Sequence, residues 1–209
     1  MASLSPEERS ALRDAVTRLL ADKSTEADVR RAMDTERGYD PELWAALAEM
    51  GITGLVIDEV HGGAGAGPLE LEAVMEAAGA SLLCGPFLGS SVLSAALVQA
   101  LGDEAANARL LPGVAAGTAI AAAALTGEDG LWTEDSVAVT ATGDALSGVA
   151  SYVIHGQNAD VLLVLARTSD GLGVFEVDPR GAGVTISALP TFDHTLRLAR
   201  IVFDGARGT

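Results

Sequence analysis

The stretch DPELWAALAEMGITGLVIDEVHGGAG, residues 40–65, contains a complete helix signal followed by a glycine-rich connector. Asp40 is suited to cap the helix, and Pro41 stands at the first helical position, where its missing N–H is tolerated. Four apolar residues then recur at helical spacing and form one stripe, in which we expect Trp44 to be a core anchor: Leu43, Trp44, Leu47 and Met50. Gly51 should end the helix, and residues 51–68 should form the connector.

Further helices are expected on both sides of this stretch. Ser5 and Glu8 form a capping box with Pro6 between them, and apolar residues follow at helical spacing from Leu12 to Leu20. Residues 21–38 are polar and are expected to bend or connect. Downstream, the pattern predicts helices over 68–80 and 90–101 and a short helix that ends at Pro112.

Beyond Gly117 the apolar pattern changes. Residues 118–126 are apolar and could form a helix or a strand, and their four consecutive alanines favour a helix by propensity. Val137, Val139 and Ala141 then alternate with polar residues, and short apolar runs at 152–154, 161–165, 184–189 and 196–203 are separated by turn residues. The expected fold class is α+β, with an all-helical domain over 1–117 and an antiparallel β-barrel or sandwich domain over 118–209.

Composition and charge exclude several kinds of partner. Hydrophobic residues make up 49% of the 209 residues, as in globular proteins, and the net charge of −16 argues against nucleic acid and membrane surfaces as partners. Residues 77–102 carry no charge and are long enough to span a membrane, but Gly85-Pro86 should break them, so we interpret them as buried core.

The N-terminus does not resemble a signal peptide, and the single cysteine allows no internal disulfide. We expect Cys84 to be a buried core residue in a reducing compartment, which indicates a cytoplasmic protein. A catalytic thiol is the alternative, although no histidine or cationic residue stands near it in the sequence.

Three motifs have both a structural and a functional interpretation. HGGAGAG at 61–67 could bind phosphate, but it lacks the Gly-Lys-Ser/Thr ending, so a flexible connector is favoured. His61, His155 and His194 have no metal-ligand spacing and are expected at the surface or in caps. The segment TGEDGLWTED at 126–135 holds four carboxylates, which could serve acid–base chemistry or bind Ca²⁺; their spacing favours a solvated acidic loop.

Four blocks of this sequence, in this order, resemble the acyl-CoA dehydrogenase family. Residues 40–65 are similar to its N-terminal signature, and GDEAANARLLPGVAAGTAIAAAALT (102–126) resembles its run from the last N-terminal helix into the first β-strand. LSGVASYVIHGQNADVLLVLART (146–168) resembles a block that normally reads Leu-Asn-Gly-x-Lys-x-Trp-Ile-Thr-Asn-Gly and then Ala-Asp. TFDHTLRLARIVFDGARGT (191–209) resembles the closing strands of the family's β domain.

The resemblance implies an enzyme that binds FAD and an acyl-CoA thioester from fatty-acid or steroid side-chain oxidation. In the family a carboxylate removes the α-proton while the β-hydrogen leaves as hydride to the flavin, which yields the 2-enoyl-CoA. The β domain contacts the flavin through a Leu-Thr-Glu-Pro loop and a Trp-Ile-Thr strand. The matching positions are the cofactor-binding candidates: Leu125, Thr126, Tyr152 and Ile154. Expected partners are the acyl-CoA substrate, an electron-transfer flavoprotein or similar acceptor, and further subunits in a homo- or hetero-oligomer.

The matched positions also depart from the family pattern. Gly127 stands for the family's Glu, Tyr152 for its Trp and Ile154 for its Thr. A lost Thr hydroxyl removes a hydrogen bond worth ~0.5–1.5 kcal/mol. The added Glu128 and Asp129 would repel a ligand pyrophosphate unless they point outward.

The family's C-terminal four-helix domain, which carries the usual catalytic base, is expected to lie outside these 209 residues, so the catalytic residue is unknown. The leading interpretation is an acyl-CoA dehydrogenase given without that domain and inactive as this chain alone. The alternatives are a non-catalytic partner subunit of a heteromeric acyl-CoA dehydrogenase and a scaffold domain that has lost FAD.

Overall fold

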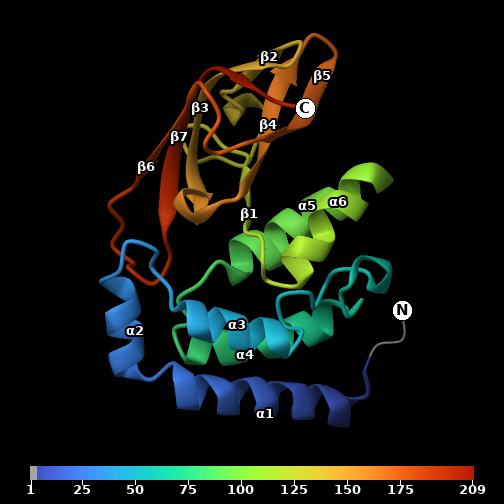
Figure 1. Ribbon diagram of the computed structural model, residues 1–209, viewed down its shortest axis with the longest axis vertical. Coiled ribbons are helices and arrows are strands. Elements are labelled where there is room, and N and C mark those ends of the chain that lie inside the picture. The colour runs from blue at the N-terminus through green and yellow to red at the C-terminus, as the bar shows by residue number, and fades with distance from the viewer. Residues whose placement is uncertain (1–3) are drawn as a thin grey trace.

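The computed structural model describes residues 4–209 and separates a helical region from a sheet region, as Figure 1 shows. The helical region comes first in the chain and lies beneath the sheet in this view. Its helices are α1 (Pro6–Lys23), α2 (Glu26–Met33), α3 (Pro41–Glu49), α4 (Pro68–Ala80), a π-helical segment (Phe87–Ser94), α5 (Ala95–Leu101) and α6 (Glu104–Ala115). The strands are β1 (Ala121–Ala124), β2 (Thr140–Thr142), β3 (Ala145–Ile154), β4 (Val161–Thr168), β5 (Gly171–Val177), β6 (Val184–Ala188) and β7 (Leu198–Arg207).

Side-chain caps define the starts of the first helices. The predicted capping box is present, because the Glu8 N–H donates to Ser5 Oγ and the Ser5 N–H donates to Glu8 Oε2. The predicted N-cap of α3 is also present, since Asp40 accepts a hydrogen bond of 2.8 Å from the Glu42 N–H. These local signals act within three residues, which explains why the sequence shows them.

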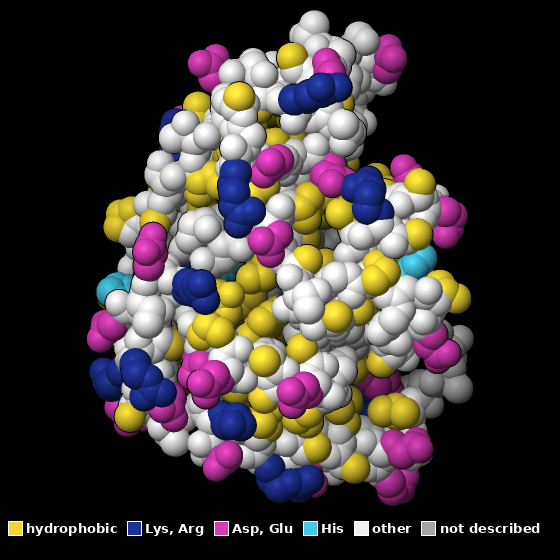
Figure 2. Space-filling view, viewed as in Figure 1, with side chains coloured by type: hydrophobic (Ala, Val, Ile, Leu, Met, Phe, Trp, Pro, Cys, Tyr) yellow, Lys and Arg dark blue, Asp and Glu magenta, His cyan; other side chains and the backbone are white. Residues whose placement is uncertain are grey.

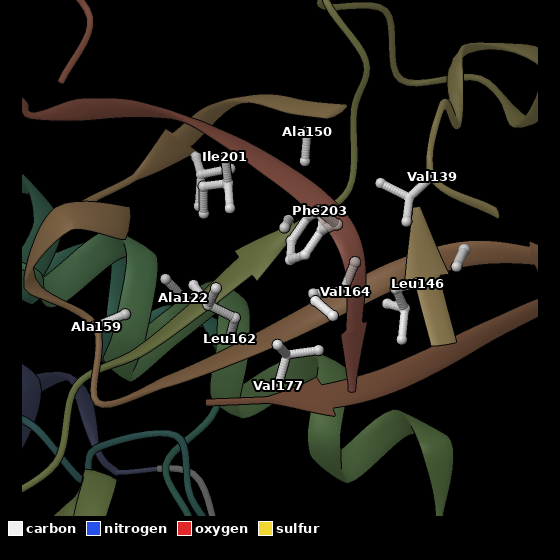
Figure 3. Close-up of a cluster of buried hydrophobic side chains, with 14 of the residues drawn as sticks. Ala122, Val139, Leu146, Ala150, Ala159, Leu162, Val164, Val177, Ile201 and Phe203 are labelled. Carbon is white, nitrogen blue, oxygen red and sulfur yellow. The ribbon is translucent and has the colours of Figure 1, made fainter. Parts of the chain in front are cut away.

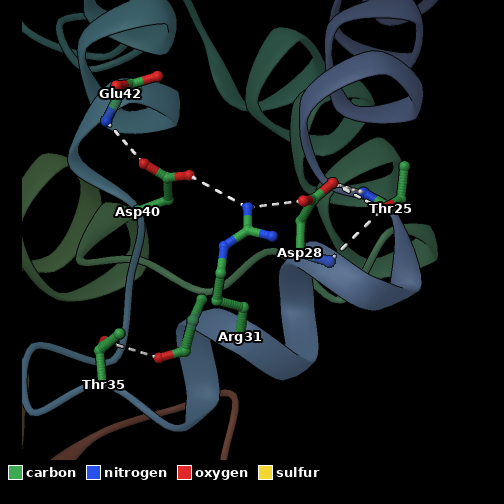
Figure 4. Close-up of polar contacts among 7 residues, drawn as sticks. Thr25, Asp28, Arg31, Thr35, Asp40 and Glu42 are labelled. Atoms are coloured by element: carbon green, nitrogen blue, oxygen red, sulfur yellow. Dashed lines mark hydrogen bonds and ion pairs between the residues drawn. The ribbon is translucent and has the colours of Figure 1, made fainter.

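The polar segment 21–38 contains a helix that we did not expect. Thr25 and Asp28 form a second capping box at the start of α2. Arg31 on α2 then bridges Asp28 at 2.7 Å and Asp40 at 4.0 Å, so that it joins α2 to the start of α3 (Figure 4). The helix was missed because only Val29 and Ala32 of its residues are buried, too few to give a visible apolar period.

The apolar stripe of α3 packs into the helical core, with one exception. Leu43, Trp44 and Leu47 are buried against α1 and α4, and the Trp44 indole N–H donates to the Gly117 carbonyl at 2.9 Å. Met50 is exposed, contrary to its predicted place in the stripe. The helix ends at Glu49, and the chain turns through a left-handed Gly51 with φ of 75°, so the helical period no longer directs Met50 inward.

The sheet is mixed and open. The predicted order of helices followed by a sheet is confirmed, but β4 pairs in parallel with both β1 and β2, while the other pairings are antiparallel. Strands β1 and β4 run in parallel because both begin beside the helical region, where the Asp160 N–H donates to the Ile120 carbonyl. One face of the sheet encloses a core to which Leu162, Ile201 and Phe203 contribute (Figure 3).

Strand β1 corrects the expectation of a helix over 118–126. Residues 121–124 pair with 161–164 of β4 and are buried on both faces. Ala122 and Ala124 contact the sheet core, whereas Ala121 faces a second cluster that includes Val98 of α5 and Leu111 of α6. The helix propensity of alanine is weak and is overridden by tertiary contacts. Here the small side chain allows close packing on both faces of the strand at once.

The uncharged stretch 77–102 is divided as predicted. Helix α4 ends at Ala80, and Pro86 directly precedes the π-helical segment. Across the described residues, no helix combines the length and the apolar character needed to cross a membrane. Apolar side chains do reach the surface between the two regions, where carboxylates and arginines border them (Figure 2).

Replacing Trp44 with alanine should destabilise the fold strongly. The indole is buried and its N–H is bonded to Gly117, so Trp44→Ala should lower the free energy of unfolding by about 3–5 kcal/mol. For a chain of this size that corresponds to a melting temperature lower by roughly 6–20 °C. Trp132→Ala is the matched control, because Trp132 is exposed and should change the melting temperature little. Equal melting temperatures for the two variants would contradict the assignment of Trp44 to the core.

Candidate functional site

The four cofactor-binding candidates, Leu125, Thr126, Tyr152 and Ile154, lie together where the chain leaves β1 and where β3 ends. We call this place the candidate edge. Thr126 and Ser151 form a β-bridge, in which the Ser151 N–H donates to the Thr126 carbonyl at 2.9 Å. Leu125 and Thr126 therefore lie beside Ser151 and Tyr152, with Ile154 two residues farther along β3. The structure brings together positions that are more than 25 residues apart in the sequence.

Tyr152 is turned out of the sheet by a bulge. The pairing of β3 with β7 shifts between Ala150 and Val153, and Tyr152 adopts a left-handed φ of 58°. Its ring lies against Gly130, where an added Cβ would come within 2.9 Å of the ring, and its hydroxyl donates to the Glu128 carbonyl at 3.2 Å. The half-exposed tyrosine ring is thus held over the segment that follows Thr126.

Ile154 links the sheet to the helical region at this edge. An added Cβ on Gly89 of the π-helical segment would lie 2.9 Å from Ile154 Cγ2, so only glycine allows this approach. The Ser94 hydroxyl donates to the Gly89 carbonyl at 2.7 Å, and Ser90 Oγ accepts from the Ala121 N–H at 3.0 Å. The buried Ser91 hydroxyl has no hydrogen-bond partner among the described residues. Such π-helical turns are often found beside functional sites.

The acidic segment 127–136 is folded back on itself. The Gly127 N–H donates to the Ser136 carbonyl at 2.9 Å, and the Arg167 guanidinium donates to the carbonyls of Glu134 and Val137. Glu128 forms an ion pair with Arg200 of β7 at 2.8 Å. Its carboxylate is therefore directed toward Arg200 and is neutralised there. The expectation of a solvated acidic segment is met, since Glu128, Asp129, Glu134 and Asp135 are exposed.

The candidate edge offers a ligand a flat apolar surface and few free side-chain hydrogen-bonding groups. Leu125, Tyr152 and Ile154 are partly exposed and together offer apolar and aromatic surface. The Thr126 hydroxyl already donates to the Ser151 carbonyl at 2.8 Å, and the Tyr152 hydroxyl donates to Glu128. Ile154 has no polar side-chain atom. A flavin ring placed here would therefore meet apolar contacts and backbone groups.

The other functional candidates of the sequence lie away from this edge or have a packing explanation. Gly63 of the HGGAGAG motif has no room for a side chain, because a Cβ would overlap the Ile57 carbonyl. Cys84 is buried, and burial raises the pKa of its thiol, which disfavours the reactive thiolate. Among residues 4–209, no three His, Cys, Asp or Glu side chains gather as a metal site would require.

The sequence also matches a known family over more than half of the described residues. The model of the acyl-CoA dehydrogenase N-terminal domain covers residues 6–118. The chain belongs to the acyl-CoA dehydrogenase family. IpdE2 of Mycobacterium tuberculosis, an acyl-CoA dehydrogenase, is 34% identical over 94% of this chain and 51% of its own length. FadE27 of the same organism, another acyl-CoA dehydrogenase, is 35% identical over 75% of this chain and 42% of its own length.

Solved structures of the family share the fold. A chain in the ChsE4–ChsE5 complex from Mycobacterium tuberculosis superposes with a TM-score of 0.86 and 31% identity, over 99% of this chain and 56% of that one. The present chain therefore spans about half the length of the acyl-CoA dehydrogenases that it matches. The division of the chain into domains at Gly117 stays a prediction.

His155, which stands where the acyl-CoA dehydrogenase block has Asn, corrects the expectation of three surface or capping histidines. It is fully buried, has a left-handed φ of 53° and lies edge-on to Tyr39, with ring centroids 6.4 Å apart. Its Nδ1 lies 3.1 Å from the Asn158 amide. Burial, together with the nearby positive charge of Arg197, lowers the pKa of His155 to about 4, although the Gly85 carbonyl opposes the shift. A lone histidine between apolar residues gave no sign of this in the sequence.

Polar contacts around His155 join the helical region to the sheet region. Arg197 donates to the carbonyls of Met33 and Thr35 at 2.6 and 2.8 Å, and the Asn158 amide donates to the Arg37 carbonyl at 2.8 Å. Beside this junction lies a cleft of about 680 Å³, which Arg37, Tyr39, Asn158 and other residues line. None of the four cofactor-binding candidates lines this cleft.

Stability should depend on pH through His155. The folded protein keeps His155 neutral down to about pH 4, whereas an unfolded imidazole takes up a proton near pH 6.5. Between these values the unfolded state binds the additional proton, so the free energy of unfolding should decrease by roughly 3 kcal/mol as the pH falls from 6.5 to 4. Chemical denaturation across this range should show a smaller decrease for His155→Asn than for the unchanged protein. His194→Asn, at an exposed histidine, should keep the full decrease. Identical pH profiles for all three proteins would refute the assignment.

Proposed function

We propose that the complete protein takes part in FAD-dependent α,β-dehydrogenation of an acyl-CoA thioester in the cytoplasm. The observation that carries this proposal is the shared edge of β1 and β3, where Leu125, Thr126, Tyr152 and Ile154 come together within an acyl-CoA dehydrogenase fold. Ile154 also lies against Gly89 of the π-helical segment. This edge is the place where the family resemblance puts the flavin. The substrate class we propose is a fatty-acyl or steroid side-chain thioester.

In this proposal the chain supplies a wall and excludes water. Leu125, Tyr152 and Ile154 would hold the flavin ring through apolar and aromatic contact, and the backbone around Thr126 would supply the remaining polar contacts. Bound FAD supplies a hydride acceptor for the β-hydrogen of the thioester. Glu128 is paired with Arg200, and the carboxylate that removes the α-proton would come from a part of the protein outside these residues. An electron-transfer flavoprotein or a similar protein would then reoxidise the enzyme.

A second candidate function is that of a partner subunit in a heteromeric acyl-CoA dehydrogenase. Two observations favour it. The side-chain hydroxyls at the candidate edge are already bonded within the chain, which would leave the flavin fewer contacts here. Solved relatives include the ChsE4–ChsE5 complex and the Tcur3481–Tcur3483 steroid acyl-CoA dehydrogenase, at 31% and 29% identity. A paralogue could then bind FAD with its own half of the site.

The 209-residue chain alone should not catalyse dehydrogenation. We expect no turnover of octanoyl-CoA or of a steroid side-chain CoA thioester above a control with free FAD, measured with a dye as electron acceptor. The physical reason is that Glu128 beside the candidate edge is paired with Arg200, and that the family's catalytic base is expected outside these residues. Turnover above the control would show that this chain carries its own base.

The assembly state should separate the two candidate functions. The full-length protein is produced with and without a neighbouring acyl-CoA dehydrogenase paralogue, and native mass and FAD per chain are measured. A mixed oligomer with less than one FAD per chain is expected for the partner subunit. A homo-oligomer that binds one FAD in every chain and turns over acyl-CoA would exclude the partner role and support the enzyme by itself. A preparation without FAD or activity in either form would refute both.

A further inference from the structure

We propose that the cleft between the helical region and the sheet region is a binding site for a small carboxylate that also carries an O–H or N–H donor. We call it the junction cleft. Its volume is about 680 Å³, and ligand pockets usually measure roughly 300–1,000 Å³ and often lie between domains. The site is distinct from the candidate edge, because none of the four residues of that edge lines it.

Three segments that are far apart in the sequence form the junction cleft. One is the connector between α2 and α3, which supplies Arg37 and Tyr39 and rises to the sheet region in Figure 1. Residues 157–160, directly before β4, form the second wall, and residues between 179 and 188 form the third. The Asn158 amide donates to the Arg37 carbonyl at 2.8 Å and so fixes the first two walls to each other. A ligand would therefore meet a preformed site.

The charges of the junction cleft favour a ligand with a single negative group. Two arginines and two carboxylates line the cleft, and their formal charges cancel: Arg37, Arg180, Glu36 and Asp160. Arg180 lies 3.7 Å from Asp160, whereas the Arg37 guanidinium forms no ion pair with a carboxylate of the described residues. A guanidinium binds a carboxylate through two parallel hydrogen bonds. Molecules with several phosphates, such as FAD and coenzyme A, are disfavoured because the two carboxylates would repel them.

Tyr39 and Gln157 indicate that the ligand also carries a hydrogen-bond donor. Burial raises the pKa of the Tyr39 hydroxyl, while Arg37 lowers it and Asp160 raises it further, so this hydroxyl lies close to both charges. It forms no hydrogen bond with a described residue. The Oε1 atom of Gln157 is buried and also lacks a partner among the described residues, which costs about 1–3 kcal/mol. A rotation of this amide toward a donor in the cleft would remove that cost.

A small ligand accounts for these groups better than a further segment of the same polypeptide. Where the two regions of this chain contact each other, they do so through apolar packing at β1 and through side chains such as Arg197 that donate to backbone carbonyls. The junction cleft instead combines an unpaired guanidinium, a free hydroxyl and an unsatisfied amide oxygen in a concave site. A few placed polar groups of this kind are typical of pockets for small molecules.

Four probes with the same phenyl body test this chemistry in the full-length protein by calorimetric titration. The phenyl body suits the apolar parts of the wall, Pro179 and Ile186. Phenyllactate and phenylalanine carry a carboxylate beside a hydroxyl or an ammonium group, phenylpropionate lacks the donor, and phenylalaninamide lacks the carboxylate. We expect phenyllactate or phenylalanine to bind about tenfold more tightly than the two controls, as the loss of one charged hydrogen bond implies. The tighter of the two distinguishes a hydroxy acid from an amino acid as the ligand.

Variants of the full-length protein locate the binding site. Arg37→Gln should weaken binding of the better probe about tenfold, while the carbonyl of residue 37 still accepts from Asn158, so the junction is preserved. Tyr39→Phe should also weaken binding. Arg18→Gln, at an exposed arginine of α1 outside the cleft, should bind as the unchanged protein does. Melting temperatures without probe report whether each variant is folded.

Three results would overturn the proposal. They are equal affinities for all four probes, binding that Arg37→Gln leaves unchanged, and no binding of phenyllactate or phenylalanine by the full-length protein. The last result is also expected if another part of the polypeptide fills the cleft. FAD content and turnover of the same preparations report on the dehydrogenase function separately.

Discussion

The close packing of β1 on both of its faces is the constraint on which the rest of the structure depends. The alanines at 121–124 lie between α5 and α6 on one side and the sheet core on the other, while their backbone pairs with β4. Larger side chains would force the two regions apart, since protein interiors have little spare volume. Because β1 is fixed in this way, the chain that leaves it at Leu125 and Thr126 reaches the end of β3, and the candidate edge is formed.

A second, polar junction fixes how the sheet region sits on the helical region. Arg197 and Asn158 reach across to backbone carbonyls at 33–37, and His155 is enclosed between them as a neutral ring. Hydrogen bonds to fixed carbonyls specify distance and direction, which apolar contact alone does not. The apolar contact through β1 uses α5 and α6, whereas this junction uses residues 33–37, so the two regions are held at two separate segments of the helical region.

The candidate edge shows how a family fold can be kept while its polar contacts are redirected. The hydroxyls of Thr126 and Tyr152 and the carboxylate of Glu128 all bind groups of the same chain, and Ile154 contributes only apolar surface. These contacts make the segment after Thr126 rigid and leave Trp132 facing solvent. An edge of this kind offers apolar contact to a flat ring, while the hydroxyls of Thr126 and Tyr152 are already bonded within the chain.

The sequence by itself determined the features that depend on near neighbours. The capping box at Ser5, the start of α3 and the order of helices before strands all follow from residues a few positions apart, because caps and apolar periods act locally. Tertiary structure alone decided the rest. Four alanines form a strand because β4 and two packed faces override helix propensity, and His155 is buried because distant segments enclose it. The sequence also did not show that the hydroxyls of Thr126 and Tyr152 donate to backbone carbonyls of the same chain. Those carbonyls come close only through the bridge between Thr126 and Ser151.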